Sequence, residues 1–396
     1  MTFYETDTKE HMSADALELS KSLIRRPSVT PKDAGALSVL EDFLQSVGFT
    51  CHRLPFSEIG TPKVDNLYAR IGTGAPNFCF AGHTDVVPPG DVNKWTSDPF
   101  KPEVRAGILY GRGAADMKCA IAAFAVAASS IIEMQGIEEL PGSISLLITG
   151  DEEGPAINGT KKVLSWMQER GEKIDACLVG EPTNPKILGE MVKIGRRGSL
   201  NATITVEGSQ GHVAYPDIAN NPMPRLLAFL QAANDHVFDV GNANFPPTNL
   251  EITTIDVGNP TTNLIPGEAE ARLNIRFNDE HTGADLCAFL EALSQEHTGD
   301  LGKIDVSISG ESFLSPPGHL SDIVSKAIAQ ITGTHPELST TGGTSDARFI
   351  HKYCPVVEFG LINESAHKVN ENTAIKDIAA LTSIYQEILA RYLAAA

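Results

Sequence analysis

Cysteine is scarce in this chain of 396 residues, which has six thiols and no CxxC pair. This scarcity argues against a disulfide framework or a thiolate zinc cluster. Together with the lack of a secretory leader, it predicts a reduced, cytoplasmic protein. Long hydrophobic runs are also missing: the longest, residues 119–132, is shorter than the roughly 20 residues that span a bilayer. We therefore expect no membrane segment.

Positive charge is in deficit, with 31 Lys and Arg against 50 Asp and Glu, for a formal net charge of −19. This balance argues against nucleic acid or an anionic membrane surface as a partner. A small anionic substrate is still compatible with it, because local arginines can outweigh the global field. A serine hydrolase is disfavoured, since the chain lacks a G-x-S-x-G elbow and GSQG at 208–211 has the wrong spacing.

The chain is longer than a single hydrophobic core usually grows, which predicts two domains. In its first half, predicted strands alternate with predicted helices, a pattern typical of an α/β domain with a mainly parallel sheet. The predicted helices include residues 13–23, 33–47 and 118–134, and the predicted strands include 66–71, 77–81, 143–149 and 175–180.

From about residue 198, apolar and polar residues alternate as in a strand with one wet face, and the predicted order becomes β-α-β-β-α-β. That order is the split βαβ arrangement of ferredoxin-like domains. We therefore predict a discontinuous α/β domain of residues 1–197 and 311–396. An α+β domain of residues 198–310 is inserted into it.

An apolar strand ends at His83 and Asp85, which lie two residues apart and so share one face. The carboxyl end of a strand is where open α/β sheets keep their ligands. A metal-bound histidine usually donates its other ring N–H to a carboxylate, and Asp85 is in position to accept it. Taken alone, this tripeptide is more typical of a buried histidine bonded to a nearby aspartate than of a metal site.

More histidine and carboxylate side chains follow strands or glycine loops of the same predicted domain: Asp116, Glu152, Glu153, Glu181 and His367. Imidazole mixed with carboxylate suits Zn²⁺, and Co²⁺ or Mn²⁺ can substitute. The set is too large for one tetrahedral ion but fits a pair of ions that share a bridging carboxylate. From the residues alone, Glu152 and Glu153 also fit a solvated turn.

Four motifs, GHTDVVP (82–88), GRGAADMK (111–118), DEEG (151–154) and GEP (180–182), resemble in sequence and order those of the M20 family of dinuclear zinc amidohydrolases and peptidases. Four others are similar to the desuccinylase branch of that family: GRRGS (195–199), GSQGHVAYP (208–216), GGTSDARF (342–349) and HKVNE (367–371). The resemblance runs from about residue 14 to the end. It implies a zinc-peptidase-like catalytic domain with an inserted lid and dimerisation domain.

For the metal, the resemblance implies one zinc ion on His83 and Glu181, a second on Glu153 and His367, and Asp116 as the bridge. The family also has a cis peptide after its bridging aspartate, here residues 116–117. A cis bond outside proline is rare and costs about 3–4 kcal/mol, so it is expected only in a functional loop.

For catalysis, the resemblance implies that Asp85 orients His83 and that Glu152 is the general acid/base. It also implies a homodimer, in which His212 reaches the oxyanion from the lid of the partner subunit. The implied substrate contacts are Arg196, Ser199, Tyr215, Asn263, Arg276, Gly343, Thr344 and Arg348.

The implied reaction is hydrolysis of N-succinyl-LL-2,6-diaminopimelate to succinate and LL-2,6-diaminopimelate, a step of lysine and cell-wall precursor biosynthesis. Bidentate guanidinium groups suit such an anionic substrate. Three other activities of the family stay open: N-acetylornithine deacetylase, aminoacylase and glutamate carboxypeptidase would keep the metal ligands and change the arginines. A non-catalytic metal-binding protein is disfavoured, because no ligand and no base is missing.

Overall fold

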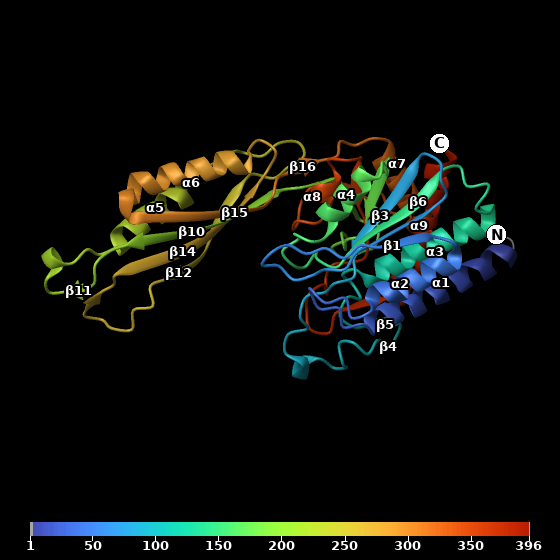
Figure 1. Ribbon diagram of the computed structural model, residues 1–396, viewed down its shortest axis with the longest axis horizontal. Helices are drawn as coiled ribbons and strands as arrows, with labels where there is room; N and C mark the ends of the chain where they lie inside the picture. The colour runs from blue at the N-terminus through green and yellow to red at the C-terminus, as the bar shows by residue number, and fades with distance from the viewer. Residues whose placement is uncertain (1–2, 396) are drawn as a thin grey trace. The chain divides into compact units, whose positions relative to one another are not determined.

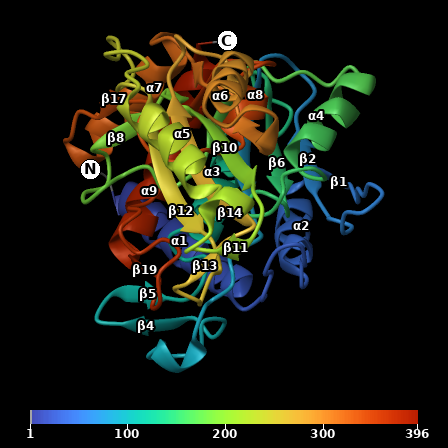
Figure 2. The same cartoon turned by 90° about the vertical axis from the view of Figure 1, so that its left-hand side faces the viewer.

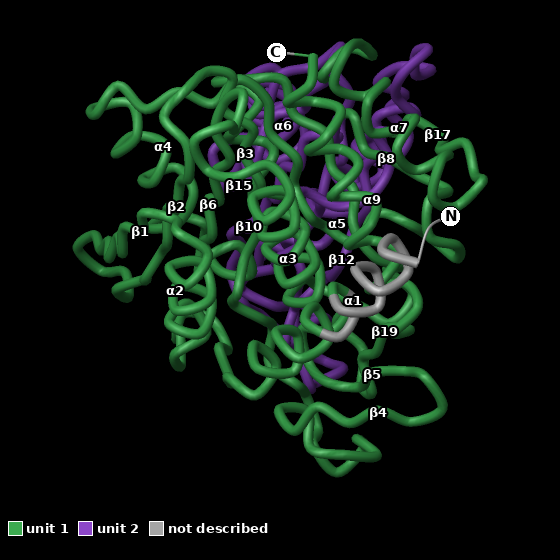
Figure 3. Tube along the Cα trace, turned by 90° about the vertical axis from the view of Figure 1, so that its right-hand side faces the viewer, with its two compact units in different colours: residues 1–194, 315–339, 345–396 green, residues 195–314, 340–344 purple. Residues whose placement is uncertain are grey.

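The computed structural model describes residues 3–395, which divide into two compact units (Figures 1 and 3). Unit 1 comprises Met1–Ile194, Ser315–Ser339 and Ser345–Ala396, and unit 2 comprises Gly195–Leu314 and Thr340–Thr344. The short segment Thr340–Thr344 belongs to unit 2 although the chain on both sides of it belongs to unit 1. No pattern in the sequence indicated this.

Unit 1 is built on an eight-stranded sheet in the order β1-β2-β6-β3-β7-β18-β8-β17. The strands are β1 Thr50–Arg53, β2 Leu67–Ile71, β3 Asn77–His83, β6 Ser143–Thr149, β7 Ala176–Val179, β8 Met191–Lys193, β17 Glu337–Ser339 and β18 Val356–Glu358. The neighbours β6, β3, β7 and β18 run parallel, and every residue in them is buried. Such fully buried strands are typical of a parallel sheet covered on both faces. The predicted mainly parallel sheet is confirmed.

One face of this sheet is covered by α3 (Lys118–Gln135) and α9 (Ile375–Ala394). Phe78 and Phe80 of β3 stack on Phe124 of α3, and the ring of Tyr385 on α9 meets Phe80 edge-on. Helix α1 (Phe3–Ile24) packs against both helices and begins well before the predicted residue 13. Helix α3 is long and apolar enough to cross a membrane, but 83% of it is buried. It is therefore a core helix of unit 1.

The opposite face is covered by α4 (Thr160–Glu169), whose Trp166 ring lies 5.8 Å from the ring of Tyr68 on β2. Tyr68 pairs with Leu147, and Leu147 pairs with Ala81, so Tyr68 points away from the face that carries Phe80. Unit 1 also contains α2 (Ala36–Val47), α7 (His319–Thr332) and α8 (Ala347–Ile350). A small sheet of β4 (Glu103–Arg105), β5 (Ile108–Tyr110) and β19 (Asn372–Ala374) completes it.

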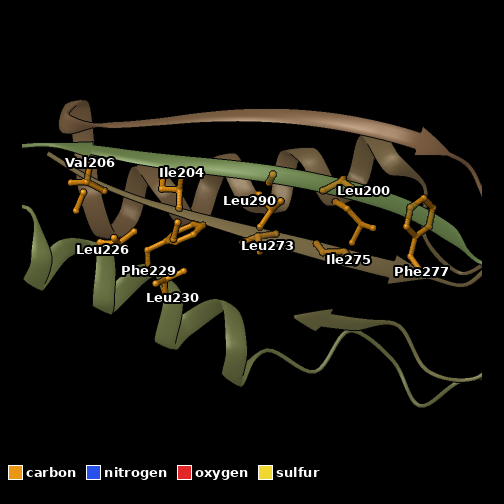
Figure 4. Packing of buried hydrophobic residues seen from close by; sticks show 14 residues of the cluster. Leu200, Ile204, Val206, Leu226, Phe229, Leu230, Leu273, Ile275, Phe277 and Leu290 are labelled. Carbon is orange, nitrogen blue, oxygen red and sulfur yellow. The ribbon is translucent and has the colours of Figure 1, made fainter. Parts of the chain in front are cut away.

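Unit 2 contains an antiparallel sheet in the order β12-β14-β10-β15. Its strands are β10 Gly198–Glu207, β12 Asn249–Asp256, β14 Glu268–Phe277 and β15 Gly302–Gly310, and its helices are α5 Met223–Asp235 and α6 Gly283–Thr298. The two helices lie side by side (Figure 2). Their Phe229 and Leu290 point at Leu273 and its neighbours on the sheet (Figure 4). The predicted β-α-β-β-α-β order is confirmed.

Two short strand pairs lie beyond the ends of this sheet. Near the start of β10, β9 (Gly195–Arg196) pairs with β16 (Phe313–Leu314). Beyond the end of β10, β11 (Gly211–His212) pairs with β13 (Leu264–Ile265). The labels of β16 and β11 in Figure 1 mark these two opposite ends of unit 2.

Candidate metal centre

The parallel register of unit 1 brings histidines and carboxylates to one edge of its sheet. Because β6, β3, β7 and β18 run parallel, their carboxyl ends share that edge. His83 is the last residue of β3, Glu152 and Glu153 follow β6, and Glu181 follows β7. His367 comes from the segment that leaves β18 toward β19. Residues far apart in the sequence thus meet at one place.

The Asp116 carboxylate lies between two imidazoles. Its Oδ1 is 3.2 Å from His83 Nε2, and its Oδ2 is 3.3 Å from His367 Nε2. Each imidazole has a second carboxylate: Glu181 Oε1 lies 3.6 Å from His83 Nε2, and Glu153 Oε1 lies 2.7 Å from His367 Nε2. The five residues therefore form two half-sites that share Asp116, which is the arrangement that a pair of bridged cations requires.

The electrostatics of the cluster also fit cations. Hydrogen bonds to Asp116 and Glu153 raise the pKa of His367 to about 10. Burial lowers the pKa of His83, but Asp116 and Glu181 outweigh burial and raise that pKa well above its usual value. Protons on the two imidazoles thus balance part of the negative charge of the carboxylates around them. Imidazole nitrogen with carboxylate oxygen is a donor set that suits Zn²⁺, so the residues fit the implied metal.

Glu152 lies beside this cluster. One ligand atom each of His83, Glu152 and Glu181 lie within 4.8 Å of one another, as do those of His83, Asp116 and Glu153. Burial and the charge of Glu181 raise the pKa of Glu152 well above its usual value. A carboxyl group with a raised pKa next to a metal site is suited to accept and return a proton.

Asp85 acts on His83 through its backbone. His83 Nδ1 lies 2.9 Å from the Asp85 carbonyl oxygen, while the nearest carboxylate oxygen is 3.7 Å away. In this geometry the Asp85 carbonyl accepts the ring N–H and leaves Nε2 directed at Asp116. The Asp85 carboxylate instead accepts hydrogen bonds from the backbone N–H groups of Glu152 and Glu153. It orients the loop that carries them.

Two motif glycines make room for the loop that carries Asp116. The peptide bond between Asp116 and Met117 is cis, as expected, and the Met117 side chain is buried. A Cβ atom at Gly82 would lie 2.4 Å from Met117 Cε, and one at Gly180 would lie 2.7 Å from the same atom. A side chain at Gly82 would therefore require the end of Met117 to shift, and one at Gly180 would displace both Met117 and the ring of Phe80.

The substrate residues predicted in unit 2 fall into two groups. At the start of β10, Ser199 pairs with Arg276 of β14, and Arg196 Nη1 donates to the Thr341 carbonyl at 3.5 Å, in the segment that also carries Gly343 and Thr344. At the other end, Val213 N–H donates to the Asn263 carbonyl, and the rings of His212 and Tyr215 lie 5.6 Å apart. The ten residues of β10 separate the groups by roughly 30 Å.

Arg348 lies in unit 1, on α8, where its Nη2 is 3.9 Å from Asp346 Oδ1. Two further charged residues, Arg112 and Glu371, are buried near the cluster although no role was predicted for them. The sequence contained a signal for them: Arg112 lies in the GRGAADMK motif and Glu371 in the HKVNE motif, and both motifs also contain predicted metal ligands.

Comparison of the sequence with known proteins identifies a family of peptidases and amide hydrolases. Residues 79–391 match the model of peptidase family M20/M25/M40. The chain is 58% identical to succinyl-diaminopimelate desuccinylase of Rhodospirillum centenum over 97% of its length and 99% of that protein. It is 55% identical to the enzyme of Parvibaculum lavamentivorans over 96% of both.

Solved structures share the fold. An M20 metallo-carboxypeptidase of Sulfolobus solfataricus has a TM-score of 0.77 at 17% identity, covering 96% of this chain and 99% of that one. A dinuclear metal-binding M20 peptidase of Bacillus subtilis has a TM-score of 0.69 at 15% identity, covering 97% and 99%. With the match to the family model and the identity to curated relatives, the chain belongs to peptidase family M20/M25/M40.

Proposed function

We propose that this protein is a metal-dependent amide hydrolase that converts N-succinyl-LL-2,6-diaminopimelate and water to succinate and LL-2,6-diaminopimelate. Metal-dependent hydrolysis is supported by the position of the Asp116 carboxylate between two imidazoles, each of which also contacts a glutamate. The substrate is supported by the names of relatives that are more than half identical over nearly the whole chain.

The proposed cofactor is a pair of Zn²⁺ ions, for which Co²⁺ or Mn²⁺ can substitute. His83 and Glu181 would hold one ion, Glu153 and His367 the other, and Asp116 would hold both. When bound, such a pair lowers the pKa of a water molecule and polarises the substrate carbonyl.

Glu152 is the proposed general acid/base. It takes a proton from the attacking water onto a carboxylate oxygen and delivers it to the leaving nitrogen, which would otherwise depart as an unstable anion. The Asp85 carboxylate supports this role, because it holds the backbone N–H of Glu152. The position of the Glu152 main chain therefore does not depend on the charge of its own side chain.

Substrate recognition is assigned to the group at the start of β10. Arg196 and Arg276 supply guanidinium groups for substrate carboxylates, and Ser199, Gly343 and Thr344 supply hydrogen bonds. Arg348 is the proposed contribution from unit 1.

We further propose a homodimer. A single small substrate cannot touch both groups of unit 2, because about 30 Å of β10 lies between them. The group of His212, Tyr215 and Asn263 would therefore serve the site of a second copy, where His212 donates to the developing oxyanion. Unit 2 also has two sheet edges, β12 and β15, at which another copy can pair.

Subunit mixing tests this arrangement. His212→Ala and Glu152→Gln are each expected to be inactive. Random mixing makes half of the dimers heterodimers with one intact site, so activity should return to about a quarter of wild type. If the mixture stays inactive while sedimentation shows exchange of subunits, His212 does not act across the dimer. A fully active monomer would remove the dimer from the proposal.

The activity itself is tested by steady-state hydrolysis with zinc-loaded protein. N-succinyl-LL-2,6-diaminopimelate and N-acetylornithine are compared at equal concentration. We expect turnover of the first only. Turnover of the second alone would overturn the substrate and leave the metal chemistry standing. The proposed compartment is the cytoplasm, which is consistent with six cysteines that are all free thiols.

A further inference from the structure

A buried ion pair lies between two loops of the candidate metal centre. Arg112 is 2% exposed and Glu371 is fully buried, and Arg112 Nη1 lies 2.6 Å from Glu371 Oε2. Burying two charges costs several kcal/mol per ion unless each is paired and its remaining hydrogen-bonding groups are satisfied. A buried ion pair such as this one does not by itself indicate a gain in folding stability. The other contacts of Arg112 and Glu371 indicate their role.

Glu371 holds the loop that carries Asp116. Its second carboxylate oxygen, Oε1, accepts hydrogen bonds from the backbone N–H groups of Ala115 at 2.9 Å and Asp116 at 3.0 Å. Its own carbonyl oxygen accepts the N–H of Gly111 at 3.0 Å. Three hydrogen bonds thus fix this loop at both ends, and one of them is made by the main chain of the bridging residue.

Arg112 contacts the segments that carry the two histidines. Its Nη2 donates to the Pro88 carbonyl at 3.3 Å and to the His367 carbonyl at 3.4 Å. Pro88 closes the same motif that contains His83. One ion pair therefore touches the three segments that present His83, Asp116 and His367.

The His367 segment has a backbone that needs such support. His367 has a φ of 62° and Asn370 a φ of 60°, in the left-handed region that costs side chains other than glycine on the order of 1–2 kcal/mol each. Such conformations persist where surrounding contacts hold them. Here the contacts are the bond from Arg112 to the His367 carbonyl and the bonds between Ser365 Oγ and the main chain of Asn372.

We infer that Arg112 and Glu371 are positioning residues for the paired ions. By tying the Asp116 loop to the His367 segment, they hold the bridging carboxylate and the second imidazole at the separation that both ions require. The inference rests on the dinuclear centre proposed above. Mutation of a residue that hydrogen-bonds to a metal ligand typically lowers metal affinity by about 10–100-fold, and we expect a loss of that size when Arg112 or Glu371 is altered. It should be greatest for the ion beside His367.

Zinc titration of purified protein tests the inference. Glu371→Gln keeps the side-chain size and removes the charge, while Arg112→Lys keeps the charge and loses the fork that reaches two carbonyls. The control is Glu172→Gln, which removes the 2.5 Å ion pair with Arg70 elsewhere in unit 1. Affinity for each ion is measured against a competing chelator, with circular dichroism to confirm the fold and kcat and KM measured at saturating Zn²⁺.

We expect two ions at wild-type affinity in Glu172→Gln. In Glu371→Gln and Arg112→Lys, at least one ion should bind 10–100-fold more weakly, with kcat largely recovered at saturating Zn²⁺. Both affinities within twofold of wild type would overturn the inference, even if the variants unfold at lower temperature. If Glu371→Gln does not fold, the Zn²⁺ affinities of Arg112→Lys alone test the inference. If wild-type protein binds fewer than two ions, the dinuclear proposal itself fails, which is a separate outcome.

Discussion

Glu152→Gln separates proton transfer from metal binding. Glutamine has the size of glutamate, and the Asp85 carboxylate holds the backbone N–H of residue 152 whatever its side chain. The change therefore removes the proton carrier and leaves the loop in place. General acid/base groups contribute about 10²–10⁴ in rate, so kcat should fall by that factor, which is about 3–5 kcal/mol of transition-state stabilisation. KM should change little, because no ground-state contact to the substrate is assigned to this side chain.

The assay is steady-state hydrolysis with Zn²⁺ content measured on the same samples. The geometry makes the metal measurement decisive, since Glu152 lies close enough to His83 and Glu181 to be a ligand itself. We expect Glu152→Gln to retain two ions, whereas Glu153→Gln should lose the ion beside His367. Loss of an ion from Glu152→Gln would make Glu152 a ligand, and near-normal turnover would end its role as the base.

Other variants probe the packing and the metal requirement. Phe124→Ala removes a fully buried ring that stacks on β3 and should lower the free energy of unfolding by about 3–5 kcal/mol, measured in urea; an unchanged midpoint would contradict the packing of α3. Gly180→Ala places a Cβ 2.4 Å from Phe80 Cζ and should cost about 1–3 kcal/mol by the same measurement, and a neutral result would show that Met117 and Phe80 can move. Removing metal with a chelator should abolish hydrolysis and leave the far-ultraviolet circular dichroism unchanged, with activity restored by Zn²⁺ alone. Residual activity after complete removal would refute the metal requirement.

Local patterns predicted much of the fold. Apolar runs that end in glycine loops predicted the buried parallel strands of unit 1, and strict alternation predicted the half-exposed strands of unit 2. The start of α1 was predicted too late, because residues 3–12 are polar and show no apolar stripe. That Thr340–Thr344 belongs to unit 2 was not predictable, since five residues carry no periodicity that indicates the unit they join.

By itself, the sequence determined the chemistry available to the protein: imidazoles and carboxylates at strand ends, in an order that resembles a family of metal hydrolases. Residue type and spacing along one strand are local properties, so a single chain displays them directly. Only the tertiary structure decided which oxygen of Asp85 meets His83, how Asp116 lies between two histidines, and that Arg112 pairs with Glu371. These distances depend on the register of strands and loops far apart in the sequence, and no local pattern encodes that register.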